Sequence, residues 1–155
     1  GDWYNAGTFS ASSTQILTFT ATSTGFVINN GSSSFQNVVF NGVNGGWSFT
    51  TSTASTTISG DLTMTTGTLS GTATTTVNGG DVTGNGTINL TGGTFTLSGT
   101  GYFGGTTNWT FYKLTFSGIE DIITATNTNN TVVTTSEIPF LLFLISSPHQ
   151  THLGK

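Results

Sequence analysis

Apolar residues along the chain recur in short alternating runs that end on Ser or Asn followed by Gly. Five such triplets, each an apolar residue, then Ser or Asn, then Gly, begin at Phe40, Ile58, Val77, Leu97 and Phe116. They follow one another at spacings of 18, 19, 20 and 19 residues. A repeat of nearly constant length predicts stacked equivalent units, and about 20 residues is the size of one coil of a solenoid.

Alternation with period two explains the residues inside each run. It places the apolar residue of the triplet, and the residue two positions earlier, on the inner side of a strand. The closing Gly permits the positive φ of a tight corner, and Ser or Asn assists through local hydrogen bonds. The second inner column mixes apolar residues with threonine, because it consists of Val38, Thr56, Thr75, Phe95 and Leu114.

These patterns predict an all-β fold, a parallel β-solenoid of about 20 residues per coil in which the five triplets stack as one buried column. The longest echo pairs FQNVVFNG, residues 35–42, with FYKLTFSG, residues 111–118. An antiparallel β-sandwich completed by a donated strand is the alternative architecture that the sequence leaves open.

Composition favours a folded, uncharged β protein. The 155 residues include 36 Thr and 22 Gly, and only 5% are charged, against roughly 25% in ordinary globular proteins. Disordered chains combine high net charge with few aromatic residues, whereas this chain has 12 Phe, 3 Trp and 3 Tyr at a net charge of −4. The basic residues are Lys113 and Lys155, so we expect no binding of nucleic acid or anionic lipid.

The composition changes after Gly118. Residues 1–118 form the Thr/Gly-rich repeat region and residues 119–155 a C-terminal extension, which we expect to belong to one structural domain. Within the extension, residues 138–147 read IPFLLFLISS, which is too short for a membrane-spanning helix of about 20 residues. We therefore expect a strand and no membrane insertion.

The apolar C-terminal strand has two interpretations. It packs against the core of its own chain, or it docks on a neighbouring subunit, because a contiguous apolar run cannot alternate between core and solvent. The candidate subunit contacts are Phe140, Leu141, Leu142, Phe143, Leu144 and Ile145.

At the level of the repeat, the chain resembles the Thr/Gly/Asn-rich repeats of large bacterial and archaeal cell-surface proteins, including adhesins and autotransporter passengers, which form β-solenoids. The segments that carry the resemblance are FQNVVFNG, WSFTTSTASTTISGDLTMTTGTLSG and FYKLTFSG, within residues 7–118. The resemblance implies an extracellular or cell-surface protein with a structural or adhesive role, and it transfers no catalytic residue.

No group of residues predicts catalysis, a cofactor or a metal site. The chain has no Arg and no Cys, and the glycosidases and lyases built on β-helices need close carboxylates with a cationic partner. Asp61 and Asp81 lie twenty residues apart in GDL and GDV, where we interpret them as turn residues. His149 and His152 lie near the C-terminus without carboxylate or Cys neighbours in sequence. We therefore expect a protein that is not an enzyme.

Asn-x-Ser/Thr sequons are candidate glycosylation sites. In an exported protein, glycans at these positions would supply the solubility that the low charge does not. The candidate acceptors are Asn30, Asn85, Asn89, Asn108 and Asn129.

The leading functional hypothesis is a structural subunit of an extracellular fibre or cell-surface filament that acts by self-association. A solenoid ends in strand edges that natural proteins normally cap or charge. Head-to-tail stacking of copies would pair these edges, and a contact that does not close on itself gives a homopolymeric filament. Low charge removes the repulsion between stacked copies.

An ice-binding solenoid is the second hypothesis. It rests on outward-facing pairs two residues apart, in which Thr-x-Thr repeats from coil to coil. Only two of five pairs are Thr-x-Thr in the predicted phase. The pairs are Asn37/Val39, Ser55/Thr57, Thr74/Thr76, Thr94/Thr96 and Lys113/Thr115.

A glycan-binding adhesin or phage fibre segment is the third hypothesis. Exposed aromatic rings could stack on sugar faces, although strand-like alternation around Trp47 and Trp109 also fits core residues. The candidate platforms are Trp3, Tyr4, Trp47, Tyr102 and Trp109.

Overall fold

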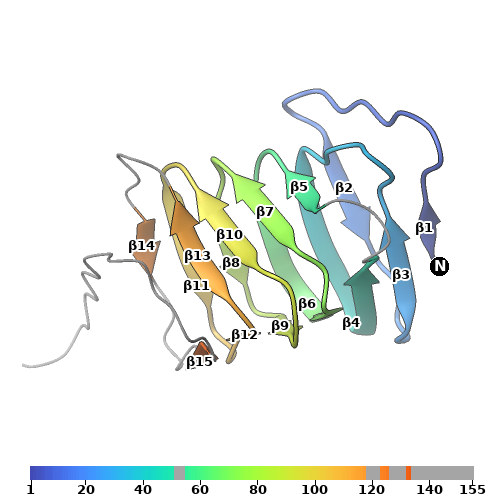
Figure 1. Ribbon diagram of the computed structural model, residues 1–155. Helices are drawn as coiled ribbons and strands as arrows, with labels where there is room; N and C mark the ends of the chain where they lie inside the picture. The colour runs from blue at the N-terminus through green and yellow to red at the C-terminus, as the bar shows by residue number, and fades with distance from the viewer. Residues whose placement is uncertain (51–54, 118–122, 126–131, 134–155) are drawn as a thin grey trace, which may run out of the picture.

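The computed structural model describes residues 1–50, 55–117, 123–125 and 132–133, the last two ranges as backbone only. The described residues form an all-β fold without helix, in which parallel strands stack as a β-solenoid of about five turns with about 21 residues per coil (Figure 1). The parallel solenoid predicted from the repeat is confirmed. The antiparallel sandwich is wrong, because every strand pair is parallel.

Each full coil has three sides, which we call A, B and C in chain order. Side A consists of β2 (Ile16–Phe19), the first half of β4 (Asn37–Phe49), the first half of β6 (Leu62–Gly71), β8 (Val82–Gly84), β11 (Gly101–Gly105) and β14 (Ile123–Ala125). Side B consists of β1 (Trp3–Tyr4), β3 (Phe26–Asn29), the second halves of β4 and β6, β9 (Thr87–Leu90), β12 (Thr110–Phe111) and β15 (Val132–Val133).

Side C is a separate sheet of four strands. They are β5 (Thr56–Ile58), β7 (Thr75–Asn78), β10 (Phe95–Ser98) and β13 (Leu114–Ser117). An isolated parallel bridge between Phe35 and Ile58 extends this side to the first coil. Because β4 and β6 run without interruption around the corner between sides A and B, those two sides form one sheet.

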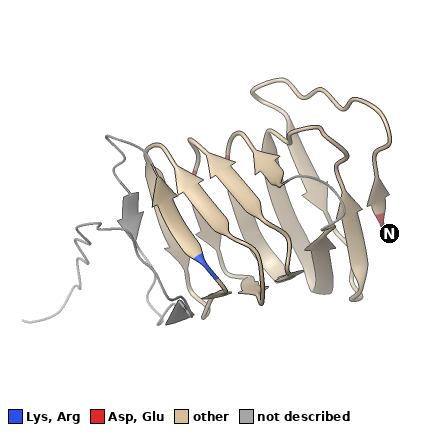
Figure 2. Ribbon diagram, in the orientation of Figure 1, with Lys and Arg blue, Asp and Glu red and all other residues tan. Residues whose placement is uncertain are grey.

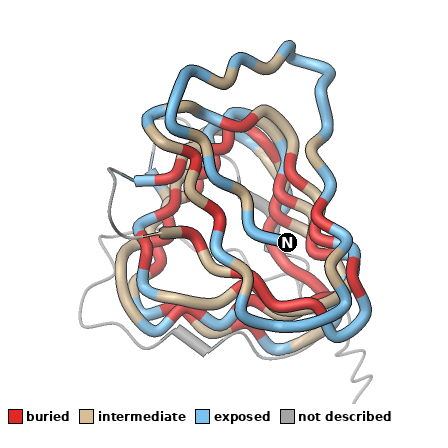
Figure 3. The backbone as a smooth tube through the Cα atoms, turned by 90° about the vertical axis from the view of Figure 1, so that its right-hand side faces the viewer, coloured by how far each residue is buried: buried red, intermediate tan, exposed pale blue. Residues whose placement is uncertain are grey.

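The interior is a continuous apolar core whose composition changes along the stack. Seen along the stack, buried positions recur around each coil (Figure 3). Aliphatic residues such as Ile58, Leu69 and Val77 fill the middle coils and are fully buried. Aromatic rings concentrate toward both ends of the described stack, where Phe19 and Phe40 pack at 5.2 Å and Phe95 and Phe111 at 5.2 Å between ring centroids. Large rings cover more area per residue where fewer neighbouring coils contribute to the core.

Four of the five predicted column members stack on side C. Ile58, Val77, Leu97 and Phe116 are direct partners on successive strands. The first three are fully buried, and Phe116 is half-buried and packs against the core. This part of the repeat prediction is confirmed.

The fifth member, Phe40, was assigned wrongly. It lies on side A, where its partners are Phe19 and Met64, and the residue that stands before Ile58 on side C is Phe35. The second inner column shares this error, because Val38 also lies on side A and pairs with Leu62. The spacing of 18 residues from Phe40 to Ile58 therefore compares a residue of side A with a residue of side C.

The error arises from a long second coil. Its corner between sides A and B holds the only register shifts of β4 against β6, at Phe40/Asn41 and Asn41/Gly46. The coil advances by 23 residues from Phe35 to Ile58, whereas the next step, from Ile58 to Val77, is 19. The echo between residues 35–42 and 111–118 fails for the same reason, since Phe35 belongs to side C and Phe111 to side B.

Two threonines occupy inner positions of side C, as the second column predicted. Thr56 and Thr75 are buried partners that continue in register to Phe95. The Thr56 hydroxyl donates to Oδ1 of the buried Asn30 at 3.3 Å, and Asn30 Nδ2 donates to the Ser33 carbonyl. Thr75 Oγ1 has no hydrogen-bond partner. The pair therefore packs through its methyl groups, as β-branched residues do in strands.

Candidate functional site

The outer surface of side C is a grid of mostly small, uncharged side chains, which we call the threonine face. Its middle row is threonine on all four strands, in direct register: Thr57, Thr76, Thr96 and Thr115. The residues two positions before and after complete two flanking rows. The flanking rows are Ser55, Thr74, Thr94, Lys113 and Ser59, Asn78, Ser98, Ser117.

Hydrogen bonds between coils hold the flanking rows of the threonine face. The Thr74 hydroxyl oxygen accepts from the Thr94 backbone N–H at 3.3 Å, and the Ser98 hydroxyl donates to Asn78 Oδ1 at 2.8 Å. The middle-row hydroxyls make no hydrogen bond to another described group, and their side chains are half-buried between neighbouring strands. The middle row therefore lies on the outer surface, and one hydrogen bond in each flanking row joins β7 to β10.

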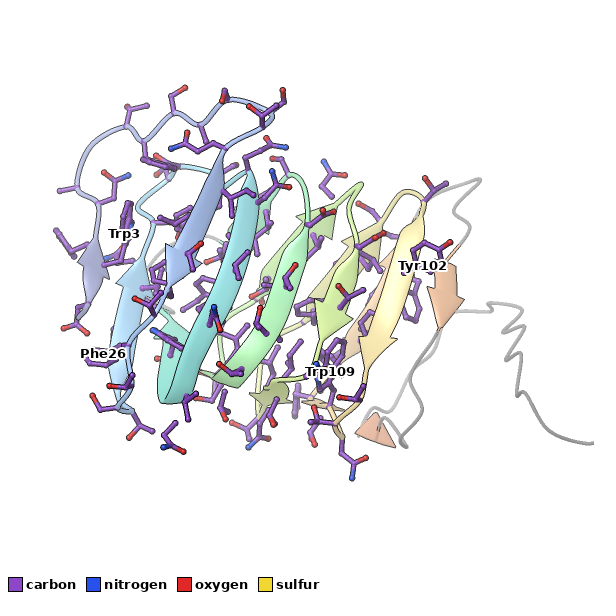
Figure 4. All side chains as sticks on the ribbon, turned by 180° about the vertical axis from the view of Figure 1, so that it is seen from behind. Trp3, Phe26, Tyr102 and Trp109 are labelled. Carbon is purple, nitrogen blue, oxygen red and sulfur yellow. The ribbon has the colours of Figure 1, made fainter. Side chains whose placement is uncertain are left out.

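The outer surfaces of the other two sides are less regular. On side A the row equivalent to the middle row runs Val39, Thr63, Thr83 and Gly104. Side A also carries an exposed Tyr102 (Figure 4). The threonine face is therefore the one outer surface of the described coils with a single residue type in register on four strands.

The N-terminal end of the stack is closed by half-buried aromatic rings. Trp3 packs edge to face against Phe9 at 5.5 Å and against Phe35 at 6.2 Å between ring centroids. Trp3 and Phe9 keep part of their surface exposed. Asp2 is the one charged residue in the first 50 positions (Figure 2), and its Oδ1 accepts the Val27 backbone N–H at 2.9 Å. This end is therefore apolar and nearly uncharged.

Exposed apolar side chains also gather on sides A and B at this end. Tyr4 of β1 is 76% exposed, and Ile16 and Val27 of the first coil are 62% and 42% exposed. Their register partners one coil further on are polar: Asn29, Asn37 and Ser48. Exposed apolar residues that cluster at one end of a molecule are typical of a contact surface.

Strand β2 leaves one edge open at this end. It pairs with β4, and no other strand of the described residues pairs with it. Asn37 of β4 donates its backbone N–H back to the Gln15 carbonyl at 3.2 Å. The Gln15 carbonyl therefore faces β4, and backbone groups alternate in direction along a strand. The N–H groups of Ile16 and Thr18 consequently point away from β4, toward the open edge.

Asp61 and Asp81 form a ladder at the corner between sides C and A. Each Oδ1 accepts the backbone N–H of the residue one coil further on, Asp81 N–H for Asp61 and Tyr102 N–H for Asp81, both at 2.9 Å. Asn37 begins the ladder, since its Oδ1 accepts the Asp61 N–H at 3.0 Å. The carboxylates thus accept hydrogen bonds from the backbone of the next coil, a role that their interpretation as turn residues did not include.

This ladder gives a prediction about the two carboxylates. Replacing both Asp61 and Asp81 by Asn should leave the melting temperature nearly unchanged, because an amide oxygen accepts the same bond, as Asn37 already does. Replacing both by Ala should lower the free energy of unfolding by about 1 kcal/mol for each lost bond. Thermal melts of the three proteins measure the difference. Equal melting of the Ala and Asn variants would show that the ladder contributes no stability, and a large shift on adding EDTA would show a bound cation instead.

Among the residues described, no group of three or more His, Cys, Asp or Glu side chains comes together. His149 and His152 lie outside the described residues, as do the candidate subunit contacts Phe140–Ile145. No described helix is long and apolar enough to cross a membrane.

The sequons occupy different environments. Asn85, Asn89 and Asn108 are exposed, and Asn85 Oδ1 accepts from the Thr106 hydroxyl at 2.8 Å. Asn30 is buried with its amide hydrogen-bonded inside the stack, which makes it the described sequon least accessible to a glycan. Asn129 lies outside the described residues.

Of the five aromatic residues considered as sugar platforms, two are interior, two are exposed and Trp3 is half-buried. Trp47 and Trp109 are fully buried, as strand alternation suggested, and Trp109 points into the stack (Figure 4). Tyr4 and Tyr102 are exposed, but Tyr4 lies on side B before the first coil and Tyr102 on side A of the fifth. The described residues thus contain no row of exposed aromatic rings.

The chain matches no protein-family model, no curated protein and no solved structure, so its function has to be inferred from its own residues and geometry.

Proposed function

We propose that the chain is a structural segment of an extracellular fibre or cell-surface filament, of the kind found in bacterial and archaeal surface proteins, and that it acts by self-association. The observation that carries the proposal is the unpaired edge of β2 at an apolar, nearly uncharged end of the stack. A second copy that docks its last coil on this edge continues the parallel sheet and forms a head-to-tail homopolymer.

The physical argument concerns the cost of leaving that end exposed. An open strand edge presents unpaired N–H and C=O groups, and natural proteins protect such edges with charge, proline or a covering segment. Residues 3–9 cover side B and part of side C with Trp3 and Phe9. No strand of the described residues pairs with the outer edge of β2. Docking would pair the open backbone groups of Ile16 and Thr18 and bury part of the exposed aromatic surface.

Charge favours the same contact. The described residues carry four charged side chains, Asp2, Asp61, Asp81 and Lys113 (Figure 2). Asp2 lies at the N-terminal end and Lys113 begins the last coil of side C. The described residues at the two ends therefore contribute little like-charge repulsion, and assembly should depend little on salt.

The test replaces Thr18 by Pro. Thr18 is exposed, and its N–H faces the open edge, so proline removes no internal hydrogen bond and blocks strand addition. We expect the unaltered chain to form rods in negative-stain electron microscopy and large species in light scattering. Thr18→Pro should be monomeric, and Thr18→Val, which keeps the N–H and the β-branched shape, should assemble normally.

Two results would overturn the proposal. One is a dispersed monomer of the unaltered chain at all salt concentrations and pH values. The other is unchanged filaments from Thr18→Pro with a normal far-ultraviolet circular dichroism spectrum. Ile16→Lys is a second variant in case the proline weakens folding, because it adds a charge at an exposed edge position and should also prevent stacking.

A further inference from the structure

We propose that the threonine face binds ice. The face consists of three rows on β5, β7, β10 and β13, with a middle row made only of threonine. The proposed self-association uses the ends of the stack, whereas this surface lies on its side. Each proposal can therefore fail while the other stands.

The spacing of the grid is fixed by the backbone. Adjacent strands lie about 4.8 Å apart, and residues two positions apart in one strand lie about 6.6 Å apart. The spacing between strands is close to the shortest lattice repeat of hexagonal ice, and it sets the rows of the face. The direct pairing of Thr57, Thr76 and Thr96 keeps the grid in register from coil to coil.

Threonine suits such a surface chemically. Its χ1 angle is restricted by the β-branch, and the strands on either side hold each middle-row side chain half-buried. The methyl group orders the water next to it, and the hydroxyl can anchor that water by donating and accepting hydrogen bonds. A regular array of such groups would hold a layer of water in positions that an ice plane can share.

Other ligands fit the surface less well. The described part of the face has one charged residue, Lys113, at the end of a flanking row, so ionic ligands lack partners. It presents no aromatic ring for a sugar. A repeating, uncharged array of hydroxyl and methyl groups instead matches a repeating, uncharged, hydrogen-bonding solid.

The structure supports the ice-binding hypothesis better than the sequence alone, because it shows which residues belong to side C. The predicted pairs included Asn37/Val39, which lie on side A and do not interrupt the face. The bridge between Phe35 and Ile58 places Ser34 and Gln36 next to Thr57 and Ser59 instead. The face therefore continues with polar residues into the first coil.

The experiment measures thermal hysteresis and ice-crystal shape with the full chain, against bovine albumin at equal concentration. We expect faceted crystals and hysteresis above the albumin control. The double variant Thr76→Tyr/Thr96→Tyr should lose both, because two bulky rings at the centre of the grid hold the ice plane away. The matched control Thr63→Tyr/Thr83→Tyr carries the same change on paired, half-buried outward positions of side A and should retain both.

Incorporation of fluorescently labelled protein into a growing ice crystal provides a second measurement. Thr96→Lys is the alternative variant in case the double substitution unfolds the chain, and it should also be excluded from the crystal. The proposal is overturned by round, unshaped crystals with hysteresis at the albumin level, or by an equal loss in the side A control. Light scattering of Thr18→Pro, in which stacking through the ends is blocked, shows whether two threonine faces pack on each other. Such a dimer without ice shaping would equally overturn it.

Discussion

Replacing Trp109 by Ala is expected to lower the free energy of unfolding by about 3–5 kcal/mol. Trp109 is fully buried, packs edge to face on Phe103 at 5.6 Å between centroids, and donates its indole N–H to the Gly86 carbonyl at 2.9 Å. The substitution removes a large part of the aromatic core at this end. Because a domain of this size has about 5–15 kcal/mol of net stability, urea denaturation should show a much lower midpoint or an unfolded chain at 25 °C.

A comparison of two tryptophans separates packing from hydrogen bonding. Trp47 is as deeply buried as Trp109, but its indole N–H has no hydrogen-bond partner. Trp109→Phe removes the bond to Gly86, worth about 0.5–1.5 kcal/mol, whereas Trp47→Phe removes an unsatisfied donor. We expect Trp109→Phe to be the more destabilising of the two. If Trp47→Phe costs as much or more, the indole bond of Trp109 contributes nothing beyond packing.

The repeat of the middle and later coils could be predicted because their lengths barely vary. From Ile58 to Phe116 the side C strands advance by 19, 20 and 19 residues, so the spacing of the triplets reports the true coil. Period-two alternation then assigns inner and outer positions correctly, including the buried Thr56 and Thr75. Local pattern and coil length agree in this region.

The second coil could not be predicted in the same way. An apolar residue followed by a small polar residue and Gly suits any corner, so Phe40 on side A imitates a side C triplet. The additional residues of this coil lie in the irregular corner around Asn44, which has a positive φ of 63°. Only the total length of the coil would distinguish side A from side C. Nothing in a window of ten residues shows that this coil is longer than its neighbours.

The surface features depend on contacts between coils, and for that reason the sequence indicated them incompletely. The threonine at each middle-row position is visible in the sequence, but the row exists only once the register joins Thr57 to Thr76 and Thr96. The ladder of Asp61 and Asp81 needs the backbone N–H one coil away. The burial of Asn30 likewise needs Thr56, 26 residues later. Sequons and turn motifs are local and carry no such information.

The stacking of coils also makes some glycines irreplaceable, and Gly84 gives the sharpest test. Its φ is +132°, and a Cβ atom at this position would lie within 3.0 Å of backbone atoms of Met64, its partner one coil earlier. Gly25 has φ +94° with no atom within 4 Å of the same hypothetical Cβ. An alanine at either position would carry the strain of a positive φ. Of these two positions, only Gly84 would also place its Cβ atom against the backbone of another coil.

Gly25→Ala should therefore cost about 1–3 kcal/mol from backbone conformation alone. Gly84→Ala should cost this amount plus about 1–3 kcal/mol from overpacking, because the atoms it meets are backbone and can move only if two coils separate. The difference in urea midpoint between the two variants measures the tightness of the stack. Equal destabilisation of the two variants would mean that the coils move apart at Gly84 without cost. The close packing between β6 and β8 would then not be a reason for glycine at this position.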